Sequence, residues 1–129
     1  MTPDQHRQKA ERICQSTEKI DHSVYEMVIE GAYLSAIHWL NYALHRMEVT
    51  AEAHDIVHTE HLSGMDRGKI GALMPEVLAT VDELETFRTR YVRGNIAGGL
   101  VAAKRALELH EQVQSAAIDA APFKQAAAE

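Results

Sequence analysis

Histidines are the residues of this 129-residue chain best suited to chemistry, and it has eight of them. His54, His58 and His61 follow one another at intervals of four and three residues, with Asp55 beside the first. If residues 51–62 form a helix, these imidazoles share one face, and two imidazoles one turn apart can chelate a divalent transition metal. The spacing therefore predicts a metal site at His54, His58 and His61. The alternative is that all three are solvated histidines on a helix surface.

Two familiar metal chemistries do not fit the sequence. Di-iron carboxylate bundles use a Glu-x-x-His pair on each of two helices, and the chain contains no Glu-x-x-His. Zinc proteases carry a glutamate directly after the first histidine of His-x-x-x-His, whereas Asp55 occupies that position here. Any metal site would therefore be of another kind.

A second group of residues suited to chemistry is a basic segment in an acidic protein. The net charge of −6 argues against a protein that coats nucleic acid through its overall charge. Between residues 86 and 107, however, the chain has five cations and no carboxylate, and the other eight cations face 19 carboxylates, so the rest of the chain carries −11. The five cations are Arg88, Arg90, Arg93, Lys104 and Arg105.

The arginines of this segment precede a glycine-containing turn, residues 94–99, that leads into a helix N-terminus. Free backbone amides at such an end can hold an anion, and neighbouring guanidinium groups would strengthen the site. The pattern predicts a seat for a nucleotide or RNA phosphate at Arg88, Arg90, Arg93 and Asn95. The alternative is ordinary placement of cations at a helix C-terminus, where the helix dipole favours them.

Composition indicates the setting of the protein. The single cysteine, Cys14, excludes an internal disulfide and a Cys-rich zinc site, as expected in a reducing compartment. No apolar run approaches twenty residues, and the polar N-terminus does not resemble a signal peptide. We therefore expect a cytoplasmic protein with no membrane association.

The elements that must position these residues are all helical. The three prolines fall where helices begin or end, and alternating β-branched residues are nearly absent. Thr2-Pro3-Asp4-Gln5 predicts a capped start for a first helix that ends at Glu30-Gly31, followed by a helix with an apolar face over residues 33–47. That second helix either continues or breaks near residues 49–50.

The second half of the chain completes the expected bundle. The three glycines of residues 63–71 predict a loop, a third helix starts near Pro75, and a fourth runs from Leu100 to Ala117. We expect an up-and-down bundle of four to five helices, formed by a single domain of residues 1–120 with a frayed tail at 121–129. Trp39 and Tyr42 lie off the main apolar stripe; they indicate either a homodimer face or a wider core face.

Several short motifs resemble those of HEPN-domain proteins, small prokaryotic helical bundles named for nucleotide binding. They are the Gly31, Tyr33 and Ala36 pattern, followed by Tyr42-Ala43, and the Leu84, Arg88 and Gly94 pattern. Thr59 and His61 stand close to a Thr-His of that family, with Glu60 between them. The resemblance covers roughly residues 20–115. It implies a homodimeric bundle that binds nucleotide or RNA, or that pairs with a small nucleotidyltransferase in a toxin–antitoxin arrangement.

Many active HEPN proteins are metal-independent ribonucleases, which place a histidine a few residues after an arginine and a polar residue. Arg88 and Thr89 match the start of that motif, but no histidine follows through Asn95. General acid–base cleavage of RNA would therefore lack its imidazole. We expect phosphate binding without catalysis; a degenerate ribonuclease and a metal-binding bundle are the alternatives.

Overall fold

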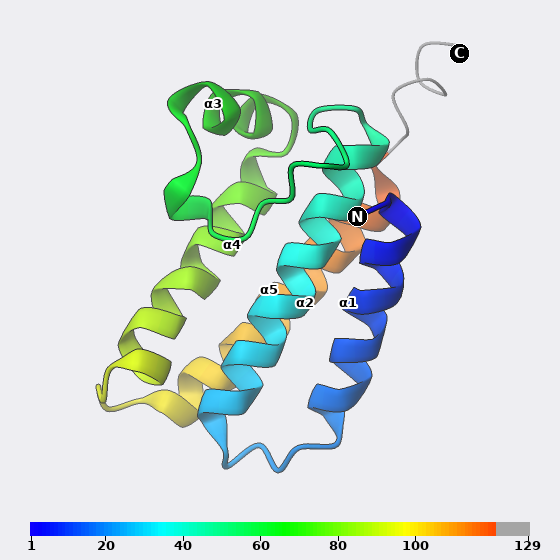
Figure 1. Ribbon diagram of the computed structural model, residues 1–129. Helices are drawn as coiled ribbons and strands as arrows, with labels where there is room; N and C mark the ends of the chain where they lie inside the picture. Colours follow the sequence, from blue (N-terminus) through cyan, green and yellow to red (C-terminus); the bar gives the residue numbers. More distant parts are fainter. Residues whose placement is uncertain (121–129) are drawn as a thin grey trace.

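The structure is a computed structural model that describes residues 1–120, and within these residues it consists of helices joined by loops, with no strand (Figure 1). The all-α bundle class predicted from the sequence is thereby confirmed. The predicted tail, residues 121–129, lies outside the described residues. The elements in chain order are α1 (Pro3–Glu18), α2 (Tyr25–Arg46), η1 (Thr59–His61), α3 (Gly64–Leu73), α4 (Pro75–Phe87), η2 (Arg88–Arg93) and α5 (Gly99–Asp119).

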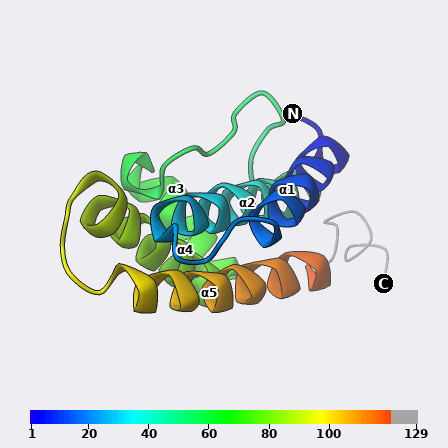
Figure 2. The ribbon, with the colours of Figure 1, turned by 90° about the horizontal axis from the view of Figure 1, so that it is seen from below.

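Helix α2 is the central element of the bundle. It packs against α1, α4 and α5, and Figure 2 shows it lying between α1 and α4 with α5 beneath. Because neighbours cover it on several sides, α2 is apolar around most of its circumference, with Tyr33, Leu40 and Leu44 fully buried. No helix in the described part of the chain has the length and apolar character needed to cross a membrane.

Trp39 and Tyr42 belong to this core. Their exposed fractions are 1% and 4%, and their rings pack edge to face with centroids 5.4 Å apart. Arg7 of α1 lies over both rings, and Arg46 covers Tyr42 with its guanidinium carbon 4.9 Å from the ring centroid. The two aromatics therefore widen the core face of the chain and are not an exposed apolar patch, as the second of the two interpretations expects.

The predicted end of the first helix at Glu30-Gly31 is wrong, because α1 ends at Glu18 and α2 has already begun at Tyr25. The break occurs at Asp21, whose side chain accepts a hydrogen bond from the backbone of Ser23 and forms a turn. Gly31 serves a different purpose from a terminator. A Cβ at this position would lie 2.1 Å from Thr17 Oγ1, so glycine allows α1 and α2 to approach closely.

The segment after α2 consists of turns followed by extended chain around residues 54–58, and it is not helical apart from the single turn of η1. Helix α2 does end close to the predicted break, at Arg46. Asn41 of α2 then holds the following chain with two hydrogen bonds of 2.8 Å, one to the carbonyl and one from the N–H of Ile56. Tyr33 donates a further bond to the carbonyl of Val57. These side-chain bonds use backbone groups that a helix over residues 51–62 would need.

The predicted loop at residues 63–71 is also wrong, since α3 covers most of it. Ser63 caps α3 by accepting a hydrogen bond from the N–H of Asp66, and Ile70 is fully buried. Arg67 pairs with Asp82 of α4 at 2.8 Å. Together these contacts offset the entropic cost of the glycines. The predicted start of a helix at Pro75 and the predicted last helix are confirmed by α4 and α5.

Candidate metal centre

Three side chains suited to metal binding meet where the start of α1 lies beside the end of α2. The two helices run in opposite directions because a short connection, residues 19–24, joins them. The N-terminus of the chain therefore lies beside the C-terminal end of α2 (Figure 1). This packing brings His6 of α1 next to His45 of α2. Asp55 reaches the same place from the extended loop that Asn41 holds.

The geometry is that of a compact set of donors. Nε2 of His6 and Nε2 of His45 each lie 2.8 Å from the same oxygen, Oδ1 of Asp55. The two rings have their centroids 5.1 Å apart, and one donor atom from each of the three residues falls within 4.8 Å of the others. Both imidazoles are nearly inaccessible, while 29% of the Asp55 side chain is exposed. The two buried imidazoles thus lie beneath a carboxylate that solvent can reach.

The second nitrogen of each imidazole is also held in place. Nδ1 of His6 lies 2.9 Å from Nδ1 of His38, which is about two turns before His45 on the same face of α2. Nδ1 of His45 lies 2.8 Å from the hydroxyl oxygen and 3.2 Å from the carbonyl oxygen of Thr50. Histidines that bind metal almost always use the other ring nitrogen in this way, which fixes the orientation of the ring.

Electrostatics set the protonation states. Burial raises the pKa of Asp55, but hydrogen bonds from His45 and His6 and the charge of the chain's amino group outweigh it and lower the pKa to about 2. Burial lowers the pKa of His6, and the contact with Asp55 only partly offsets that effect. A charged carboxylate and a neutral imidazole are the forms that coordinate metals.

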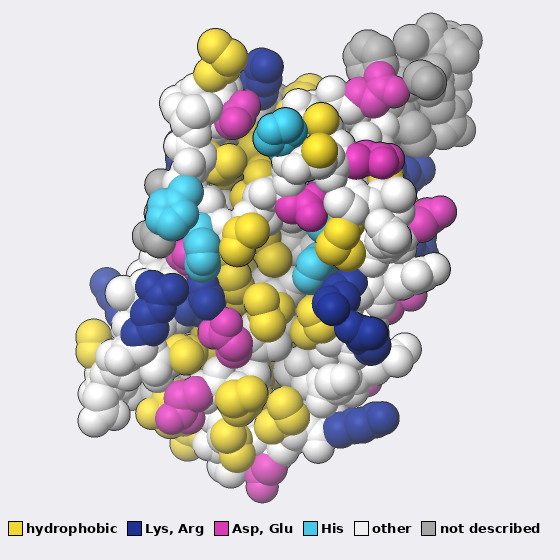
Figure 3. Space-filling model, viewed as in Figure 1, with side chains coloured by type: hydrophobic (Ala, Val, Ile, Leu, Met, Phe, Trp, Pro, Cys, Tyr) yellow, Lys and Arg dark blue, Asp and Glu magenta, His cyan; other side chains and the backbone are white. Residues whose placement is uncertain are grey.

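The histidines singled out in the sequence lie beside this cluster and not within it. His54, His58 and His61 line a surface hollow of about 290 Å³ to which Asp55 also contributes. The rings of His58 and His61 are 5.3 Å apart, and Nδ1 of His58 pairs with Glu85 of α4 at 2.8 Å. Figure 3 shows histidines at several places on this face, with carboxylates among them. The helical geometry on which their predicted metal site depends is absent.

The residues of the predicted phosphate seat separate into two groups. Arg88 faces inward: its guanidinium group pairs with Glu30 at 2.9 and 3.0 Å and with Glu85 at 2.9 Å, and it lies over the Tyr33 ring, 4.2 Å from the centroid. Arg90, Arg93 and Asn95 are exposed on η2 and the following turn. Arg88 is therefore neutralised by two carboxylates, and the other three residues are on the surface.

Nothing in the sequence pointed to His6 as a partner of His45. The two residues are 39 positions apart, and only the packing of α1 on α2 joins them. A usable signal was the pair His38 and His45, seven residues apart and so on one face of α2. Comparisons of the chain with protein-family models, with curated proteins and with solved structures found no match. The resemblance to HEPN domains stays a prediction.

Proposed function

We propose that this protein binds a divalent transition metal at His6, His45 and Asp55. The observation that carries the proposal is the convergence of two buried Nε2 atoms, from two different helices, on one carboxylate oxygen at 2.8 Å. Burying two imidazoles costs solvation free energy. A metal that takes the place of their two hydrogen bonds to Asp55 would offset this cost through its own binding free energy.

The donor set favours particular metals. Imidazole and carboxylate ligands suit Zn²⁺, Fe²⁺, Ni²⁺ and Mn²⁺, whereas softer ions prefer thiolates. With metal–ligand bonds of about 2.1 Å, tetrahedral donors lie about 3.4 Å apart, so Oδ1 of Asp55 has to move roughly half an ångström away from the two Nε2 atoms. Asp55 lies on a loop and can make that adjustment without moving α1 or α2.

The outer contacts are compatible with the cluster both with and without metal. Without metal, each Nε2–H donates to Asp55, and the Nδ1 atoms accept from His38 and from the Thr50 hydroxyl. With metal on Nε2, the proton moves to Nδ1, which then donates to His38 or to the carbonyl of Thr50. No buried nitrogen loses its hydrogen bond in either state, so binding leaves no unsatisfied group.

Three protein ligands leave at least one coordination position free. Of the three ligand residues, Asp55 also borders the hollow lined by His54, His58 and His61, so these histidines lie near the proposed centre. A metal held in this way can polarise a bound oxygen and lower the pKa of a bound water. The neighbouring histidines are then groups near the metal that do not ligate it.

The proposal is tested by metal titration of protein first stripped with a chelator. Zn²⁺, Ni²⁺ and Co²⁺ are added separately, and thermal unfolding, calorimetry and the visible absorption of Co²⁺ are recorded. A metal at one hundred times its Kd should raise the free energy of unfolding by about 2.7 kcal/mol. Asp55→Asn keeps the shape of the side chain but removes its charge, so it should abolish this gain.

His54→Gln is the matched control, because His54 borders the hollow but is not a proposed ligand. It should keep the metal affinity within about threefold, because the His54 side chain neither ligates the metal nor hydrogen-bonds to a residue that does. The proposal is wrong if no metal stabilises the wild type, or if Asp55→Asn titrates as the wild type does. Loss of binding in His54→Gln alone would instead favour the site predicted from the sequence.

A second candidate function is phosphate binding at the turn after η2. It is supported by the resemblance to HEPN domains and by Arg90 and Arg93, which are exposed and have no ion-pair partner among the described residues. Titration with AMP and with a short single-stranded RNA tests it. Arg90→Ala combined with Arg93→Ala should weaken binding about tenfold or more, whereas the exposed Arg12→Ala should not. Equal affinity in both variants would exclude this seat.

A further inference from the structure

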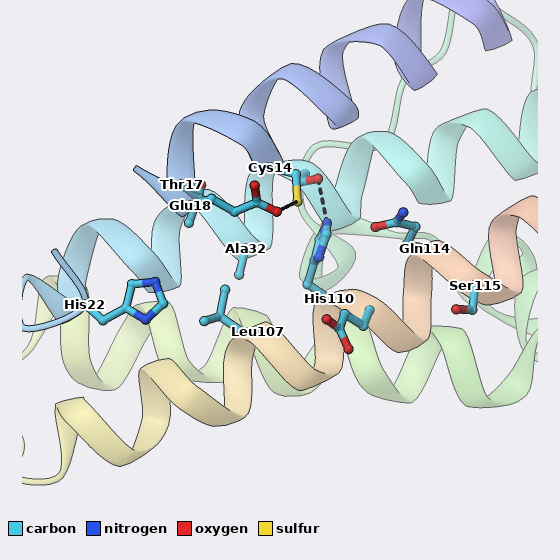
Figure 4. A pocket seen from close by; sticks show the side chains of 12 residues that line it. Cys14, Thr17, Glu18, His22, Ala32, Leu107, His110, Gln114 and Ser115 are labelled. Carbon is cyan, nitrogen blue, oxygen red and sulfur yellow. Dashed lines mark hydrogen bonds between the residues drawn. The ribbon is translucent and has the colours of Figure 1, made fainter. Parts of the chain in front are cut away.

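A cavity of about 500 Å³ lies between α1, α2 and α5, and it shares no lining residue with the metal centre. It exists because α2 presents small residues there, Gly31, Ala32 and Ser35, so the three helices leave space between them. Figure 4 shows the cavity with Cys14, Thr17 and Glu18 of α1 on one side and Leu107 and His110 of α5 on the other. This volume is typical of sites that bind small molecules.

The buried end of the cavity holds a polar pair, Ser35 and His110, with exposed fractions of 0% and 4%. Ser35 Oγ lies 2.8 Å from the carbonyl oxygen of Ala10 and 2.7 Å from Nε2 of His110. The carbonyl can only accept, so the single hydroxyl proton goes to Ala10 and His110 must donate from Nε2. The neutral ring then carries its lone pair on Nδ1.

That lone pair is an unused acceptor. Nδ1 of His110 has no hydrogen-bond partner among the described residues, and this atom is not fully enclosed by protein but opens onto the cavity that His110 lines. Burial lowers the pKa of His110, which keeps the ring neutral. An acceptor that opens onto a cavity and has no protein partner can receive a hydrogen bond from a ligand that carries a donor.

The charged residues around the cavity determine which sign of charge a ligand can carry. Glu18 and Glu111 line it, and its lining residues include no lysine or arginine. Burial raises the pKa of the Cys14 thiol, and the same two carboxylates raise it further, so the thiol is uncharged. The field inside the cavity is therefore negative, which favours cations and repels anions.

We propose that this cavity binds a small organic ammonium ion. The ammonium group donates to Nδ1 of His110 and is neutralised by Glu18 and Glu111, and its apolar body lies against Ala32 and Leu107. The ligand and the cavity are then complementary in hydrogen bonding, in charge and in apolar surface. This proposal is independent of the metal centre.

The test compares two probes of the same shape, benzylamine and benzyl alcohol, by NMR titration of the full-length protein labelled with ¹⁵N. Benzylamine should shift the amide signals of Ala32, Ser35 and His110 and the imidazole nitrogen signals of His110. Benzyl alcohol should bind about tenfold more weakly, because it lacks the charge. Absence of shifts with benzylamine at millimolar concentration, or equal affinity for both probes, would overturn the proposal.

Charge-neutralising variants identify the site. Glu18→Gln combined with Glu111→Gln should weaken benzylamine binding about tenfold, and both side chains are exposed, so the fold should persist. Glu26→Gln combined with Glu83→Gln changes the net charge equally but away from the cavity lining, and it should bind as the wild type does. If both double variants lose affinity to the same degree, the attraction is general and the cavity is not the site.

Discussion

The imidazole rings of His6 and His45 lie with their centroids 5.1 Å apart, although one residue stands in the first turns of α1 and the other in the last turn of α2. Their Nε2 atoms share Oδ1 of Asp55. The cluster therefore joins α1, α2 and the following loop. A ligand that binds there would stabilise the packing of all three.

The contact between His38 and His6 should influence metal affinity. His38→Phe keeps a ring of similar shape but removes the nitrogen 2.9 Å from Nδ1 of His6, so that imidazole loses its orienting partner. We expect Zn²⁺ affinity to fall about tenfold, measured by competition with a chromophoric chelator. Thr50→Ser keeps the hydroxyl beside His45 and should change affinity less than threefold. An unchanged affinity in His38→Phe would show that this contact does not support the centre.

Arg88 should contribute mainly to the stability of the fold. Arg88 pairs with both Glu30 and Glu85 in a mostly buried site. Arg88→Ala leaves these two carboxylates side by side without their cation. Removing one partner of a buried ion pair typically costs about 3 kcal/mol or more, and urea denaturation would measure the loss.

The comparison for Arg88 is Arg105, which is 44% exposed and pairs with Glu83 and Glu108 on the surface. Arg105→Ala should change the free energy of unfolding by less than about 1 kcal/mol. Similar losses in the two variants would contradict the inward role of Arg88.

The contact between α1 and α2 at Gly31 should not tolerate the addition of a single methyl group. Gly31→Ala places a methyl group 2.1 Å from Thr17 Oγ1, and Thr17 is buried, so the helices must separate or the threonine must rotate. Overpacking of this kind costs about 1–3 kcal/mol in urea denaturation. Thr17→Ala should recover part of that loss when combined with Gly31→Ala, because it removes the atoms that clash.

Gly68 provides the opposite expectation for the same substitution. A Cβ at Gly68 meets no atom within 4 Å, and the residue lies inside α3. Gly68→Ala should therefore stabilise the protein by about 0.5–1 kcal/mol. Equal destabilisation of both alanine variants would mean that the close approach of α1 and α2 is not the cause.

His110 should make stability depend on pH. Burial lowers its pKa in the folded protein, so as the pH falls below the ordinary histidine value of about 6.5 the unfolded chain takes up a proton before the folded protein does. The corresponding stability is present above that value and is lost as the pH falls from it towards the folded pKa. In urea denaturation between pH 7 and pH 5, His110→Gln should lose less stability than the wild type.

His22 is exposed at the rim of the same cavity and serves as the control for this titration. His22→Gln should follow the wild-type pH dependence. A wild-type slope in His110→Gln would show that other groups determine the acid sensitivity of the fold.

Features of the fold that depend on local chemistry could be predicted from the sequence. The capping box at Thr2 and Gln5, the helix start at Pro75 and the apolar face of α5 are encoded within a few residues each, and the structure has all three. Glycines are ambiguous in a sequence, because the same residue type can end a helix or let two helices touch. Gly31 does the second, and only the position of Thr17 decides it.

The sequence by itself therefore determined an all-α bundle with a large supply of histidines, but not which histidines act together. His54, His58 and His61 are close in sequence, yet Asn41 and Tyr33 hold their segment extended, so helical spacing does not apply to them. His6, His45 and Asp55 are distant in sequence, and the antiparallel packing of α1 on α2 brings them together. Side chains converge through contacts between elements, and hydrophobic periodicity fixes which face of a helix is buried but not which residues of its neighbour it meets.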